Sequence, residues 1–296
     1  MEHRFALISD GSCDLPPQEA VRLGVTVVPF YVSFDGRTYA KEGEEVSVRT
    51  FYEEMVRDPT VFPRSSLPSV EDYLAVFRPL AQAGIPALCV CITTKFSGSY
   101  NSASTAAALL REEHPGWAVH VMDSQVDTVL QGLLVREAAR LRDEGLSLDD
   151  SVTRLEAVIP TGRIIFTVGS MDYLQMGGRI GKVASVVSGK LGVKPLIVLK
   201  NGEIFPTGVF RSRTKGKARL IEQARRHLLS CDSPETYRFV VGFGYDEGEA
   251  VRFRDELLEA LRDVCGLTSL PIYQIGAAIG VHTGPHPIGV GLLRRA

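Results

Sequence analysis

Apolar and polar residues follow two patterns in the first half of the chain. Short apolar runs bounded by glycine, proline and small polar residues predict buried strands over residues 5–9, 25–32, 87–92 and 118–122. Apolar positions at helical spacing predict helices over residues 18–23, 48–57, 70–83 and 126–142, and one that starts at Ser99. Strands that alternate with helices in this way predict a mostly parallel sheet covered by helices.

The second half of the chain has a different pattern. Lys200-Asn-Gly202 separates two apolar segments and predicts a hairpin, so we expect a mixed sheet here. Further strands are predicted over residues 164–168, 239–243 and 272–275, the last of them followed only by glycine-rich loops, and helices over residues 151–159, 213–229 and 247–264. The change near residue 160 predicts an N-terminal α/β domain (1–160) and a C-terminal α/β domain (161–296).

One turn has the composition of an anion-binding site. The strand predicted over residues 87–92 runs into a segment rich in hydroxyl groups, which contains Ser97 and Gly98, and a helix then begins at Ser99. Backbone N–H groups at a helix N-terminus have no partner within the helix, and the helix dipole favours negative charge there. An ordinary helix cap is an equally good interpretation of this turn.

Small polar turns follow three of the predicted strands, at residues 9–14, 93–99 and 123–127. Parallel sheets bind ligands at the carboxyl ends of their strands, so we expect these turns to face a ligand. No nucleophile–base pair or metal-ligand spacing accompanies them, which indicates that an anion is held rather than attacked.

Composition excludes several classes of protein. The chain has 296 residues, of which 45% are hydrophobic and 23% charged, and its net charge of −2 disfavours nucleic acid as the main partner. No apolar stretch approaches the ~20 residues of a membrane span, so stable membrane insertion is not expected. The N-terminus resembles a first strand rather than a signal peptide, which predicts a cytoplasmic protein.

Seven segments together resemble the motifs of one known family. They occur in the family's order and cover nearly the whole chain: residues 8–16 (family pattern TDSTxDLP), 27–36, 64–69 (TSQPS), 92–102 (ISSxLSGTYQSA), 171–180 (LxYLxxGGRI), 192–199 (LxIKPIL) and 279–285 (xxHxGPGAxG). Each segment alone is a weak signal, and the ordered set is specific. On these segments the chain resembles the DegV proteins, which are the fatty-acid-binding partners of bacterial fatty acid kinase.

The resemblance implies two α/β domains with a long-chain fatty acid in an apolar tunnel between them and no cofactor. It also implies that the protein is not an enzyme, and that it presents the carboxylate to a separate kinase subunit, which makes the acyl phosphate. By position in the motifs, Ser65 and Ser97 correspond to the carboxylate contacts, and Arg179 and His282 to the GGRI arginine and the last-motif histidine. The amides of Gly98 and Ser99 would supply further donors, and Arg179 or a protonated His282 the positive charge.

The chain departs from the family pattern at a few positions. Ser65 and Ser99 replace threonine, Leu67 replaces glutamine, and His286-Pro287 replaces Gly-Ala. These changes leave the fold prediction intact and bear on acyl-chain selectivity and on the shape of the entrance.

Other functions remain open at this stage. A phosphoryl-transfer or kinase-like enzyme of a related α/β fold would use His282 or His286 on a small polar substrate and would need a polar pocket. A hydrolase based on Ser97 lacks the G-x-S-x-G elbow, and a transcriptional regulator lacks a basic recognition helix.

Overall fold

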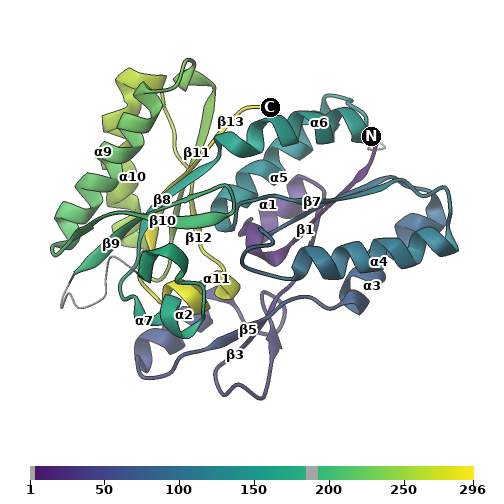
Figure 1. Cartoon of the computed structure of the whole chain (residues 1–296), viewed down its shortest axis with the longest axis horizontal. Coiled ribbons are helices and arrows are strands. Elements are labelled where there is room, and N and C mark those ends of the chain that lie inside the picture. Colours follow the sequence, from purple (N-terminus) through teal and green to yellow (C-terminus); the bar gives the residue numbers. More distant parts are fainter. Residues whose placement is uncertain (1–3, 185–192) are drawn as a thin grey trace.

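The computed structural model describes residues 4–184 and 193–296 (Figure 1). Gly192, with which one of the family-like segments begins, lies outside these ranges. Three sheets organise the described chain. A parallel sheet has the order β2-β1-β6-β7, built from β1 (Ala6–Asp10), β2 (Val25–Val28), β6 (Ala87–Cys91) and β7 (Val119–Asp123). A small antiparallel sheet has the order β4-β3-β5, built from β3 (Tyr31–Ser33), β4 (Ala40–Lys41) and β5 (Arg64–Ser66).

The third sheet is mixed and belongs entirely to the second half of the chain. Its strand order is β10-β9-β8-β13-β11-β12, with β8 (Arg163–Thr167), β9 (Lys194–Lys200), β10 (Glu203–Phe210), β11 (Tyr237–Phe243), β12 (Ile272–Gln274) and β13 (Ile288–Arg294). Only β11 and β12 pair in parallel. The parallel first sheet and the mixed later sheet confirm the predicted fold class.

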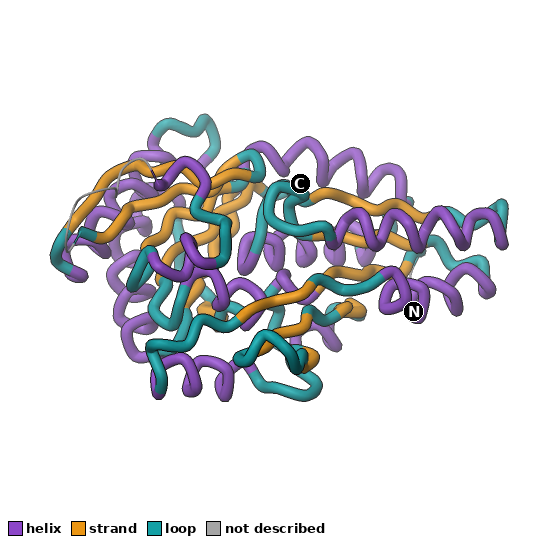
Figure 2. The backbone as a smooth tube through the Cα atoms, turned by 60° about the horizontal axis from the view of Figure 1, so that its bottom comes forward, coloured by secondary structure: helices purple, strands orange, loops and turns teal. Residues whose placement is uncertain are grey.

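Helices cover the faces of these sheets (Figure 2). The N-terminal part contains α1 (Pro17–Arg22), α2 (Val48–Arg57), α3 (Val70–Ala83), α4 (Ser99–Glu113), α5 (Thr128–Asp143) and α6 (Leu148–Val158). The C-terminal part contains α7 (Asp172–Met176), α9 (Arg213–Leu229), α10 (Glu247–Cys265) and α11 (Ala277–Thr283). In Figure 1, α9 and α10 lie together on the outer side of the mixed sheet, and α3 and α4 lie at the opposite end of the molecule.

Helix α5 packs between the parallel sheet and the mixed sheet. Each of its first eight residues, 128–135, is buried, a pattern typical of a helix buried all round. Val129, Leu130 and Leu133 belong to one core cluster with Leu88 of β6 and Val240 of β11. The two sheets therefore share one hydrophobic core instead of meeting across a polar interface.

The structure corrects the prediction at the end of the chain. Residues 272–275 were expected to form the last strand, followed only by loops, but α11 and β13 come after them. β13 pairs with both β8 and β11 and so lies inside the mixed sheet. His282 consequently sits on a helix, not in a loop.

Two further corrections concern strands. The single strand predicted over residues 25–32 is divided into β2 and β3, which belong to different sheets, and the break occurs at Pro29, which has no N–H to donate. The short strand β5, which carries Ser65, was not predicted.

The contact between α7 and α11 requires a glycine. A Cβ atom added to Gly177, which follows α7, would lie 2.1 Å from Nδ1 of His282 on α11. We expect Gly177→Ala to lower the free energy of unfolding by about 1–3 kcal/mol, because the partly buried imidazole has to be displaced. Urea unfolding would measure this change.

Gly116→Ala is the matched control, since a Cβ at Gly116 would have no atom within 4 Å. Equal stability of the two alanine variants would show that the packing of His282 against Gly177 does not constrain the fold.

Candidate functional site

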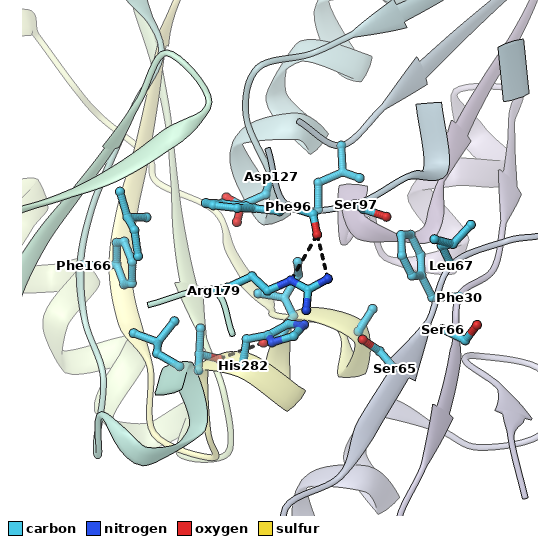
Figure 3. A pocket seen from close by; sticks show the side chains of 16 residues that line it. Phe30, Ser65, Ser66, Leu67, Phe96, Ser97, Asp127, Phe166, Arg179 and His282 are labelled. Carbon is cyan, nitrogen blue, oxygen red and sulfur yellow. Dashed lines mark hydrogen bonds between the residues drawn. The ribbon is translucent and has the colours of Figure 1, made fainter. Parts of the chain in front are cut away.

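A cavity of about 200 Å³ lies between the sheets (Figure 3). Segments from both halves of the chain contribute to its walls, and most of the lining side chains are apolar. The lining residues are Phe30, Ser65, Ser66, Leu67, Ile92, Phe96, Ser97, Asp127, Phe166, Leu174, Arg179, Ile204, Ala278, Ile279, His282 and Thr283. The polar members of this set include four of the six residues singled out from the sequence, namely Ser65, Ser97, Arg179 and His282.

Ser97 lies in the turn between β6 and α4. Its Oγ accepts a hydrogen bond from the backbone N–H of Ser99 at 3.2 Å, so it helps to satisfy the start of α4 while it also lines the cavity. Ser97 therefore supports the start of α4 and faces the cavity, and its role in binding an anion stays a prediction. Gly98 lines a neighbouring, more open hollow together with Ser97 and Arg179.

The side chain of Ser99 points away from the cavity. Its hydroxyl is fully buried, lies 2.6 Å from the hydroxyl of Tyr73 and donates to Asp10 Oδ2 at 2.7 Å. Asp10 also accepts from the backbone N–H of Ile92, at 2.9 Å, and from Ser12 and Gln131. This buried carboxyl thus ties the ends of β1 and β6 to the start of α4 and holds the turn in place.

Ser65 reaches the cavity from the opposite side. It lies on β5, where it pairs with Val32 of β3, and Ser66 and Leu67 follow it along the rim. Leu67 is 37% exposed, and a Cβ at Gly98 would lie 3.3 Å from its Cδ2. The leucine that replaces the family's glutamine therefore packs against the turn between β6 and α4.

Arg179 bridges the two sides of the opening. Its Nε and Nη2 donate to the backbone oxygen of Phe96 at 3.2 Å and 3.1 Å, and its Nη1 donates to the oxygen of Gly177 at 2.7 Å. Phe96 belongs to the turn after β6, and Gly177 follows α7. The guanidinium is exposed at this rim, where it adds a positive charge beside the hydroxyl of Ser97.

His282 is held as a neutral imidazole. Burial, with a smaller effect from the charge of Arg179, lowers the pKa of His282 to about 4. Its Nδ1 is buried and has no hydrogen-bond partner in the part of the chain that the structure describes. Of the two residues considered from the sequence as a source of positive charge, His282 is therefore neutral near pH 7, which leaves the guanidinium of Arg179 as the candidate.

Asp127 is a cavity residue that the sequence analysis did not select, although it named the turn 123–127. It precedes α5 and is 8% exposed, and burial raises its pKa to about 7. Asp127 also lines a second cavity of about 40 Å³, which extends between α5 and the mixed sheet. Both cavities share Asp127, Phe166, Ile279 and Thr283, so they adjoin one another.

Two negative findings apply to residues 4–184 and 193–296. No cluster of three or more histidine, cysteine, aspartate or glutamate side chains is arranged to hold a metal ion. No helix within these ranges has the length and apolar composition to cross a membrane.

Asp127 predicts a specific pH dependence of stability. An aspartate in an unfolded chain titrates near ~4, so between about pH 4 and about pH 7 the folded protein binds a proton that the unfolded chain has released. This group therefore lowers stability as pH rises through that interval. We expect Asp127→Asn to gain stability relative to the unsubstituted protein over the same interval, by up to roughly 1.4 kcal/mol per unit of pKa shift, in urea unfolding measured across it.

Asp35→Asn is the matched control. Backbone N–H groups of Thr38 and Arg37 lower the pKa of Asp35 to about 2, so its contribution is lost only when pH falls below the unfolded value. The control should differ from the unsubstituted protein by a constant amount between about pH 4 and about pH 7. A constant difference for Asp127→Asn as well would contradict a buried, proton-binding Asp127.

Known proteins resemble this chain over nearly its full length. A stearic-acid-binding protein from Eubacterium ventriosum has a crystal structure with a TM-score of 0.92 and 42% identity, covering 98% of both chains. A DegV family protein from Thermus thermophilus, described as binding fatty acid, has a TM-score of 0.86 and 30% identity, covering 98% of this chain and 99% of that one. A DegV domain-containing protein from Deinococcus radiodurans is 32% identical over 288 residues, which are 97% of this chain and 98% of its own.

A family profile described as "Uncharacterised protein, DegV family" matches residues 4–295. The match covers all three sheets and every residue that lines the cavity. With the fold and the relatives in agreement, the chain belongs to the DegV family.

Proposed function

We propose that this protein binds a long-chain fatty acid in the cavity between its sheets and presents the carboxylate to a separate kinase. The observation that carries the proposal is the uneven distribution of polar groups along an apolar cavity. The hydroxyls of Ser65 and Ser97 and the guanidinium of Arg179 gather at the rim, whereas the four residues of the shared stretch beyond them, Phe166, Ile279, Asp127 and Thr283, include no cation. An amphiphile with one anionic end matches this distribution.

The two ends of the ligand would be stabilised by different interactions. A hydrocarbon tail gains roughly 0.8 kcal/mol for each CH₂ group that leaves water, so a tail of about 16 carbons can supply most of the affinity. A carboxylate leaves water at a cost unless donors replace its hydration. The hydroxyls of Ser65 and Ser97, the guanidinium of Arg179 and the amides near Gly98 are the donors available at the rim.

The relatives support the same ligand class. The protein from Eubacterium ventriosum is described as binding stearic acid, and that from Thermus thermophilus as binding fatty acid. Both have at least 30% identity with this chain over 98% of its length.

The rival proposal is a phosphoryl-transfer enzyme that forms a phosphohistidine at His282. It needs a polar pocket and an accessible ring nitrogen. The cavity is mostly apolar, and Nδ1 of His282 is buried against Gly177. The geometry favours the carrier.

Native mass spectrometry of the freshly purified protein, followed by extraction under denaturing conditions, tests the proposal. We expect a bound mass that matches a long-chain fatty acid. The double substitution Ser65→Ala and Ser97→Ala should weaken rebinding about 10–100-fold, because two hydrogen bonds to a charged group are lost. Ser104→Ala on α4, outside the cavity, is the matched control.

Two results would overturn the carrier. One is protein that is empty and stays empty after incubation with several fatty acids. The other is a phosphate group on His282 after incubation with ATP, which would put the phosphoryl-transfer enzyme in its place.

Presentation to a kinase requires a docking surface beside the opening. Met176, at the end of α7 next to the glycine that anchors Arg179, is 68% exposed. We expect Met176→Glu to reduce acyl-phosphate formation about ten-fold when loaded protein, ATP and a bacterial fatty acid kinase are combined, because a charge then interrupts an apolar contact. Trapping the acyl phosphate with hydroxylamine measures the product.

Leu229→Glu on α9 is the matched control, since Leu229 is 64% exposed and lies at the end of a helix that covers the outer side of the mixed sheet. The presentation step would be refuted if no acyl phosphate formed from loaded protein. Equal losses in the two variants would place the docking surface away from α7.

A further inference from the structure

Asp127 is a buried polar group in the wall of the stretch that the two cavities share. Its side chain is buried, its Oδ1 has no hydrogen-bond partner, and it makes no side-chain cap to α5 in the part of the chain that the structure describes. An unsatisfied buried polar group costs free energy, and native proteins rarely leave one without a role. Asp127 therefore needs a hydrogen-bond partner that the described part of the chain does not supply.

The position of Asp127 separates it from the residues proposed to hold the carboxylate. Of these two cavities, Ser65, Ser97, Arg179 and His282 line the first and not the second, whereas Asp127 lines both. In Figure 3, Asp127 and Phe166 lie on the other side of Arg179 from Ser65 and Ser66. A chain whose carboxylate sits at the rim would pass Asp127 with its interior carbons before it enters the second cavity.

Thr283 offers a second polar group on the same stretch. Its hydroxyl donates to the backbone oxygen of Ile279 at 3.3 Å, which leaves the oxygen able to accept. Thr128 lines only the second cavity, and its hydroxyl is bonded to Asp14. The junction of the cavities thus combines an unpaired carboxyl with a hydroxyl acceptor, between the apolar side chains of Phe166 and Ile279.

A saturated hydrocarbon chain cannot satisfy this carboxyl. Burial favours the protonated form of Asp127, and a protonated carboxyl both donates and accepts a hydrogen bond. A hydroxyl group is the smallest substituent of an acyl chain that can both accept a hydrogen bond from this carboxyl and donate one to it. A double bond offers neither a strong donor nor a strong acceptor.

We propose that the preferred ligand is a long-chain fatty acid with a hydroxyl group in the interior of its chain, and that Asp127 recognises this hydroxyl. The inference rests on the proposed fatty-acid binding and names the ligand class of the same site. Asp127 then acts as a specificity-determining residue, and it takes no part in holding the carboxylate.

Competition binding tests the inference with stearic acid and a series of hydroxystearic acids whose hydroxyl group moves stepwise along the chain. We expect one position of the hydroxyl group to bind about ten-fold more tightly than stearic acid, the effect of one satisfied hydrogen bond. Asp127→Leu should reverse the order, so that stearic acid binds more tightly than that hydroxy acid. Asp127→Asn, which keeps the shape and both hydrogen-bonding functions, should retain a preference for it.

Asp232→Leu, at an exposed loop position outside the cavities, is the matched control and should keep the preference of the unsubstituted protein. The inference is overturned if the unsubstituted protein binds stearic acid as tightly as every hydroxy acid in the series, and in that case fatty-acid binding itself still stands. It is also overturned if the preference survives in Asp127→Leu. Failure of the unsubstituted protein to bind any of these acids would remove the proposed function as well.

Discussion

The burial of α5 on all sides is the constraint on which the rest of this structure depends. The helix packs against the parallel sheet on one side and the mixed sheet on the other, so the apolar contacts of one element fix both sheets. The free energy of this shared core comes mainly from removing apolar surface from water. A sheet that moved away from α5 would expose that surface again.

The cavity lies where this packing ends. Asp127 precedes the first turn of α5 and lines both cavities. Rigid elements thus supply the apolar walls, while the polar groups come from turns and edges: Ser97 from a strand–helix turn, Ser65 from a short edge strand, and Arg179 from the segment after α7. In the proposed function, different parts of the molecule would therefore control the orientation of the ligand and its affinity.

Much of the fold could be predicted because its signals are local. Helices α2 and α3 span the predicted residues, since Ser47 and Ser69 cap them within the same segment. Helix α11 was missed because its cap is distant in sequence: Glu42 accepts from the backbone N–H groups of Ala277 and Ala278 at 2.5 Å and 3.0 Å. No sequence pattern within residues 277–283 indicates a contact with Glu42.

β13 was missed for a related reason. Glycine lowers strand propensity, yet a Cβ at Gly289 would lie 2.5 Å from the Cβ of Phe166 on the adjacent strand, so packing requires the residue that local rules disfavour.

Prediction of the candidate site from the sequence has the same limit. Motif positions identified Ser65, Ser97, Arg179 and His282 as candidates. The hydrogen bond of the Ser99 hydroxyl to Asp10 and the unpaired Oδ1 of Asp127 could not be predicted, because both depend on tertiary contacts.

The place of β13 in the mixed sheet also sets an order of events during synthesis. This strand joins β8 to β11, so the sheet stays in two separate pieces until residues Ile288–Arg294 have left the ribosome. The strands of the parallel sheet emerge much earlier and can pair first. Until β13 has emerged, the face of α5 that packs against the mixed sheet stays partly exposed. The second cavity, which Ile288 and Gly289 help to line, is therefore completed last.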